Sequence, residues 1–204
     1  MRLLKFSVML ALASLVGCAT GPSTVQPGVN SFGSMRVTAD NNWTKAAVDS
    51  TPLARSSSRT WTQEGLSNDR LLIIPRVEEG ESILENDSDL ATLPVFRADM
   101  SPEEIAKLIE SSIVNLFDGG QAVVGSSNLR LQGFGAQSGF MFDVSVAVPD
   151  GTEYRGSVGT FVDDNEMYLV IFLAADPPYY DKYAERADAI IKSATLTVRT
   201  TGKF

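Results

Sequence analysis

The residue types that most often carry catalysis are nearly absent from this chain of 204 residues. It contains no histidine and a single cysteine, Cys18. Without histidine, the chain cannot by itself build a Ser-His-Asp or Cys-His catalytic set, or a His-ligated zinc or iron site. The spacing Ser-x-x-Lys does not occur either. The sequence therefore predicts no catalytic residue, no metal site and no cofactor, and favours a protein that is not an enzyme.

Carboxylates are the remaining groups that could do chemistry. A glycosidase needs only two of them at a fixed separation, and the chain has 25 acidic residues. A carboxylate-dependent hydrolase therefore stays an alternative, although no pair is singled out. Six acidic residues lie between Glu78 and Asp89, and Asp87 and Asp89 have a spacing found in calcium loops. Since the glycine and distal glutamate of an EF-hand are missing, a solvated loop is favoured, with binding of Ca²⁺ or a basic partner as the alternative.

The glycine-rich segment from Gly133 to Phe140 reads Gly-Phe-Gly-Ala-Gln-Ser-Gly-Phe. Its spacing differs from the known phosphate-binding fingerprints, and it lies between two expected strands rather than before a helix. A hairpin loop is therefore predicted here instead of a phosphate-binding loop.

The chain begins like a secreted protein. Arg2 and Lys5 precede an apolar stretch from Phe6 to Val16. This stretch is too short to span a bilayer, which needs about 20 apolar residues, but it suits a secretory signal peptide.

The four residues Leu15, Val16, Gly17 and Cys18 resemble the lipobox of bacterial lipoproteins. The resemblance implies that residues 1–17 are removed and that Cys18 is acylated, so that covalent lipid attaches the protein to the membrane. Ala19 stands where an aspartate would retain a lipoprotein at the inner membrane, which implies the periplasmic face of the outer membrane. Residues 18–34 then form a lipidated N-terminus and a flexible tether, because they contain glycine and proline but no charge.

Removing residues 1–17 leaves 15 basic and 25 acidic side chains, a formal charge of −10. A chain this acidic, with no basic stripe, is not expected to bind nucleic acid. Residues 35–204 have the length and apolar content of a single globular domain.

Two amphipathic helices are expected in this domain. Ser101, Pro102 and Glu104 form the start signal of the first helix, with a capping box, and Asp118-Gly119-Gly120 ends it. The second helix begins near Asp176 and ends at Ser193. Between them, alternating apolar residues and tight turns predict an antiparallel meander of four strands: 123–131, 139–148, 153–161 and 167–173. Further strands are expected at 35–43, 59–63, 70–75 and 194–199.

This order of elements predicts an α+β fold, with an antiparallel sheet of six or seven strands covered by helices. Over residues 59–199 the pattern resembles the PsbP-like α/β/α sandwich superfamily. Because members of that superfamily are mostly non-catalytic accessory and binding proteins, the resemblance implies a similar role, but it supplies no functional motif to transfer.

Adjacent tyrosines at the start of the second helix cannot both face one core. Since Tyr180 fits the apolar stripe of that helix, Tyr179 is the candidate for an exposed contact residue. The sequence thus favours a non-enzymatic, membrane-anchored lipoprotein that binds an envelope protein or a small ligand. A structural subunit that anchors a larger envelope complex is the main alternative, and the oligomeric state stays open.

Overall fold

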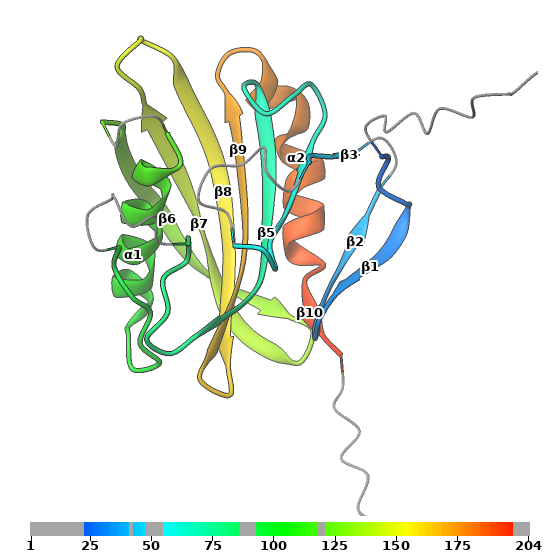
Figure 1. Cartoon of the computed structure of the whole chain (residues 1–204), viewed down its shortest axis with the longest axis vertical. Helices are drawn as coiled ribbons and strands as arrows, with labels where there is room; N and C mark the ends of the chain where they lie inside the picture. The colour runs from blue at the N-terminus through cyan, green and yellow to red at the C-terminus, as the bar shows by residue number, and fades with distance from the viewer. Residues whose placement is uncertain (1–22, 41–42, 48–54, 86–92, 118–120, 198–204) are drawn as a thin grey trace, which may run out of the picture.

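The computed structural model describes residues 23–40, 43–47, 55–85, 93–117 and 121–197 (Figure 1). Its main element is an antiparallel sheet with the strand order β3-β4-β5-β9-β8-β7-β6. The strands are β3 (Thr44–Lys45), β4 (Arg59–Thr62), β5 (Asp69–Glu78), β6 (Val123–Phe134), β7 (Gln137–Ala147), β8 (Glu153–Asp163) and β9 (Glu166–Ala175). The predicted four-strand meander is confirmed as β6 to β9, and the predicted α+β class with an antiparallel sheet is confirmed.

Alternating side chains give the sheet two apolar faces, and each face carries one helix. On β9, Leu169 and Ile171 belong to the core under α1 (Pro102–Asn115), whereas Val170 and Phe172 belong to the core under α2 (Tyr179–Lys192). The two helices therefore lie on opposite sides of the sheet (Figure 1). Strands buried on both faces explain the nearly continuous apolar sequence of β9.

Helix α1 begins as the sequence predicts. The Ser101 side chain accepts the backbone N–H of Glu104 at 3.3 Å, and the Glu104 carboxylate accepts the N–H of Ser101 at 2.7 Å. This reciprocal capping box satisfies two donors that the first helical turn leaves without partners. The apolar stripe of α1, including Ile105, Ile109 and Ile113, is buried against the sheet.

A second sheet covers part of the α2 face and contains both ends of the domain. Its strands are β1 (Gly28–Phe32), β2 (Met35–Ala39) and β10 (Thr195–Leu196), in the order β1-β2-β10. The expectation of a flexible tether up to residue 34 is therefore wrong for part of that segment, since residues 28–32 form β1. Val25, in the same segment, is fully buried. Strand β1 forms because it pairs with β2 along its whole length, and its own sequence carries no strand signal.

Close approach of α2 to the sheet depends on Gly159 of β8. A Cβ atom placed there would lie 2.2 Å from Cγ2 of Ile191, which is shorter than any van der Waals contact. The absence of a side chain at this position lets α2 settle onto the sheet. The predicted hairpins are also present: Gly135 and Ala136 connect β6 to β7, so the segment from Gly133 to Phe140 is a hairpin as expected.

Candidate functional site

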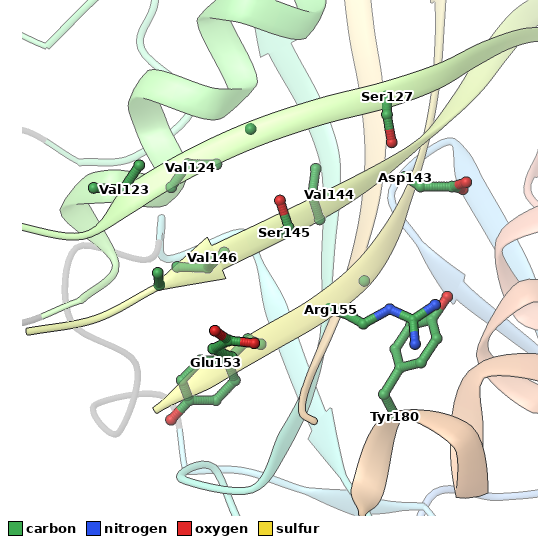
Figure 2. Close-up of a pocket in the computed structure, with 14 residues that line it drawn as sticks. Val123, Val124, Ser127, Asp143, Val144, Ser145, Val146, Glu153, Arg155 and Tyr180 are labelled. Carbon is green, nitrogen blue, oxygen red and sulfur yellow. The ribbon is translucent and has the colours of Figure 1, made fainter. Parts of the chain in front are cut away.

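The α2 face of the sheet is covered only in part, and the uncovered part is a trough over β6, β7 and β8. Along β7 this face changes from Met141, which is buried, to Asp143, half-buried, and then to Ser145 and Ala147, both exposed. The hollow has a volume of about 510 Å³. We call it the trough; its principal side chains are Ser127, Asp143, Ser145, Glu153, Arg155 and Tyr180 (Figure 2).

Arg155 and Tyr180 form the border between the trough and α2. The Arg155 guanidinium carbon lies 4.2 Å from the centre of the Tyr180 ring, which suits a cation–π contact. Arg155 also pairs with Asp176 at 3.3 Å. The Tyr180 ring also stacks with the Phe172 ring, at 6.3 Å between ring centres. Arg155 is thus held on the first turn of α2 while half of its side chain stays exposed to solvent (Figure 2).

The far end of the trough is organised by Asp143. Its two carboxylate oxygens accept from Arg130 Nη1 and Asn128 Nδ2, each at 2.8 Å. Asn128 has a φ of 55° and lies in a β-bulge of β6, where the register with β7 shifts between Ser127 and Arg130. These contacts hold the bulge in place, and Arg130 balances the charge of Asp143. The other polar groups of the trough are the hydroxyls of Ser127 and Ser145 and the charged side chains of Glu153 and Arg155.

The carboxyl group whose pKa is raised by burial is not in the trough. It belongs to Asp69 in the β4–β5 hairpin, which is 1% exposed. Its oxygens accept from the Thr62 hydroxyl at 3.1 Å and from the backbone N–H groups of Gln63 at 2.8 Å and Glu64 at 2.7 Å. Asp69 is thus engaged in shaping the hairpin and is closed to a substrate.

Of the two tyrosines Tyr179 and Tyr180, one differs from what the sequence predicts. Both are half-buried and pack against the core under α2. Tyr180 lines the trough, and Tyr179 does not. Tyr180 thus packs against the core as expected, whereas Tyr179 is less exposed than expected, and the contact role of Tyr179 stays a prediction.

The acidic segment from Glu78 to Asp89 is described up to Glu85. Glu81 pairs with Arg55 at 2.8 Å, and the Glu85 carboxylate accepts the backbone N–H of Ser56 at 2.7 Å. Within the described ranges, no group of three or more acidic or cysteine side chains is arranged to hold a metal ion. The described carboxylates thus connect this segment to residues 55–56. Asp87 and Asp89 lie outside the described residues.

Cys18 also lies outside the described residues, so its predicted acylation stays a prediction. In the part of the chain that the structure describes, neither helix has the length and apolar character needed to cross a bilayer.

Comparison with protein-family models finds no match, and no curated protein sequence matches the chain. Among solved structures, the chain is similar to cyanobacterial PsbP (CyanoP) from Synechocystis sp. PCC 6803, with a TM-score of 0.55 and 13% identity, covering 91% of this chain and 99% of that one. LpqN of Mycobacterium tuberculosis, described as involved in cell envelope biogenesis, aligns with a TM-score of 0.45 and 12% identity, covering 87% and 91%. The first similarity shows that the fold is PsbP-like, as the sequence predicted.

Proposed function

We propose that this protein is a non-enzymatic lipoprotein of the bacterial envelope that binds another envelope protein in the trough. One observation carries the proposal: a folded sheet of seven strands leaves part of the α2 face of β6 to β8 uncovered, and this part is lined with hydroxyl groups and the Arg155–Tyr180 pair. Partly exposed arginine and tyrosine side chains that neighbouring residues hold in place are typical of protein interfaces.

The shape of the trough favours a polypeptide over a small ligand. Its floor consists of three strands, and β6 is the edge strand of the sheet, so the trough has a wall at α2 but none beyond β6. Small-molecule sites usually enclose most of their ligand and are mainly apolar. An open polar surface of this kind instead suits a partner that lies across it.

Attachment to the membrane is the second part of the proposal. The lipobox residues Leu15 to Cys18 support acylation of Cys18, and Ala19 supports the periplasmic face of the outer membrane. Three acyl chains, as expected on a mature lipoprotein, exceed the two signals that stable anchoring requires. The protein partner would then be found among proteins that face the periplasm.

The experiment is photo-crosslinking in cells, with a photoreactive phenylalanine replacing one residue of the full-length protein. Ser145 probes the trough, and Glu103, exposed on α1 across the sheet, is the control position. We expect one discrete protein adduct from Ser145 that is absent from Glu103. The adduct should weaken at least fivefold when Arg155→Ala is added and stay unchanged with Arg97→Ala, an exposed arginine paired with Asp99.

Equal adducts at the two positions, or none at Ser145 in a folded and exported protein, would contradict binding at the trough. The anchor is tested separately. Cys18→Ser should abolish labelling by a radioactive or clickable fatty acid, and retention of the label in that variant would refute acylation at Cys18.

A further inference from the structure

Strand β6 forms one edge of the main sheet and is 12 residues long. A long edge strand presents unpaired backbone groups to other chains, and proteins usually protect such edges with charges, prolines, bulges or a covering element. The bulge at Asn128 divides β6 into two parts that are protected differently.

The first part of β6 is protected by α1. The carboxylate of Glu110 accepts the backbone N–H of Ser126 at 2.9 Å, although this N–H lies on the side of β6 that faces away from β7. Glu110 is only 7% exposed, and the Lys107 ammonium lies 2.7 Å from its other carboxylate oxygen. A second strand cannot pair there without displacing this side chain.

Among the residues that the structure describes, none covers the second part of β6, Leu129 to Gly133, in this way. Because alternate residues of an antiparallel strand direct their N–H and C=O groups to opposite sides, the register with β7 sets their direction. Ser126 is opposite Val144, and beyond the bulge Leu131 is opposite Phe140 and Gly133 opposite Ser138. Positions opposite even-numbered residues of β7 therefore direct their backbone groups outward. The Gly133 carbonyl agrees with this, since it accepts from the Gln132 side chain at 2.8 Å.

The exposed side chains of this part are apolar. Leu131 is 90% exposed and Leu129 is 39% exposed. The segment has one charged residue, Arg130, and this is already paired with Asp143 at 2.8 Å. No lysine, proline or acidic residue occurs in β6 to oppose the addition of a strand.

We infer that Leu129–Gly133 pairs with the same segment of a second copy of this chain, in antiparallel orientation about a two-fold axis at Leu131. This register places Leu131 opposite Leu131 of the second copy and Arg130 opposite Gln132, so the exposed leucines cover each other. Moving the axis to Arg130 would place two arginines directly opposite, which is destabilising. A self-complementary surface of this kind is what a two-fold dimer requires.

The helices leave room for this pairing. Ser126, where α1 contacts β6, is opposite Val144, and Leu131 is opposite Phe140, so the two positions are four ladder steps or roughly 14 Å apart along the sheet edge. In an antiparallel pair the two α1 helices are displaced in opposite directions from the axis and do not meet. The trough residues of β6 lie before the bulge, so both troughs of the dimer stay open.

The first test is disulfide crosslinking, which is practical because Cys18 is the only cysteine of the unsubstituted chain. Leu131→Cys is introduced into the full-length, exported protein, and membranes are oxidised before a non-reducing gel. The Cα atoms of directly opposite residues are about 5.5 Å apart, within the range of a disulfide. Val123→Cys, at another exposed position of β6 (73% exposed) that is distant from the axis, is the control, and the unsubstituted chain sets the baseline for Cys18.

We expect at least ten times more disulfide-linked dimer from Leu131→Cys than from Val123→Cys. Equal yields would overturn the proposal, as would a disulfide-linked adduct to a different protein in place of the dimer.

A second measurement uses light scattering of the detergent-extracted protein. The unsubstituted chain should have the mass of a dimer. Leu131→Lys, which places two ammonium groups across the axis, should weaken dimerisation at least tenfold with an unchanged circular dichroism spectrum. Val123→Lys should not weaken it. A monomeric unsubstituted chain at tens of micromolar would also overturn the proposal. The mass of the unsubstituted chain and the effect of Leu131→Lys do not depend on whether a partner occupies the trough.

Discussion

The carboxylate of Glu110 on α1 lies 2.9 Å from the backbone nitrogen of Ser126 on β6 and takes the place of a neighbouring strand at that point of the sheet edge. Lys107, on the same helix, donates to both oxygens of Glu110 at 2.7 and 3.0 Å. The Glu110 side chain thus attaches α1 to β6, covers an outward-facing N–H group at the sheet edge, and pairs with the charge of Lys107.

Glu110→Gln should destabilise the protein in a pH-dependent way. Burial works to raise the pKa of Glu110, but the hydrogen bonds and charge of Lys107 together with Ser126 outweigh it, so the pKa is lowered. The ionised side chain therefore stabilises the folded state above the ordinary glutamate pKa, and this contribution is lost as the pH falls through the folded pKa. We expect a loss of about 1–2 kcal/mol at pH 7 that shrinks below about pH 4.3. Urea unfolding at several pH values measures it.

The control for this prediction is Glu185→Gln, at an exposed position of α2. It should change the free energy of unfolding by less than about 0.5 kcal/mol. A constant difference between Glu110→Gln and the unsubstituted protein from pH 7 to pH 3 would contradict the role given to the charge.

Asp69→Ala should be strongly destabilising, because it removes a buried carboxylate and leaves the partly buried N–H groups of Gln63 and Glu64 without their acceptor. We expect a loss of about 2–3 kcal/mol in thermal or urea unfolding. Asp99→Ala, at an exposed site, should cost less than about 0.5 kcal/mol and serves as the control.

The pH dependence attributed to Asp69 has the opposite sign to that of Glu110. Burial raises the pKa of Asp69 despite its three hydrogen bonds. The stability that its protonated form contributes is therefore present below the ordinary aspartate pKa and is lost as the pH rises through the folded pKa. Asp69→Asn, which is neutral at every pH, should remove this decline, which begins above the ordinary aspartate pKa of about 3.9. An unchanged pH profile of unfolding would refute the assignment.

Gly159→Ala should weaken the packing of α2 on β8, since the added Cβ would meet Ile191 at 2.2 Å. We expect a loss of about 1–3 kcal/mol, the usual cost of overpacking a core. Gly125→Ala is the matched control, because its Cβ would meet the nearest atom, Ser145 Oγ, at an ordinary 3.6 Å. Equal stability of the two variants would show that α2 can move aside without cost.

Tyr183→Phe should loosen the contact between α2 and the β4–β5 hairpin. The Tyr183 hydroxyl donates to Glu64, and Lys182 pairs with the same carboxylate at 2.6 Å. We expect a loss of about 0.5–1.5 kcal/mol in the free energy of unfolding. Tyr179→Phe should have a smaller effect, and the reverse order would count against this contact.

Local signals explain why much of the fold is predictable. The start of α1 depends on Ser101 and Glu104, which are three residues apart, and the β8–β9 turn depends on Asp164 and Asn165, both with positive φ. Such features are read from a few neighbouring residues. Strand β1 has no comparable signal, because its Gly- and Ser-containing sequence forms a strand only through pairing with β2.

The trough was not predictable from the sequence, because it exists only where α2 leaves part of its face of the sheet uncovered. Arg155 and Tyr180 are 25 positions apart and meet because β8 pairs with β9, from which the chain continues into α2. Neither residue has a motif around it. The proline pair before Tyr179 indicated where α2 begins, but not which tyrosine would line a hollow.

The pairing of β2 with β10 has a consequence for the order of folding. Arg36 is opposite Thr195 and Met35 is opposite Leu196, so a strand near the start of the domain receives its second neighbour from the last strand that the structure describes. During synthesis from the N-terminus, β1 and β2 emerge long before β10. The domain therefore cannot complete its second sheet until the chain has been made as far as β10, and its apolar face needs protection from aggregation during that interval.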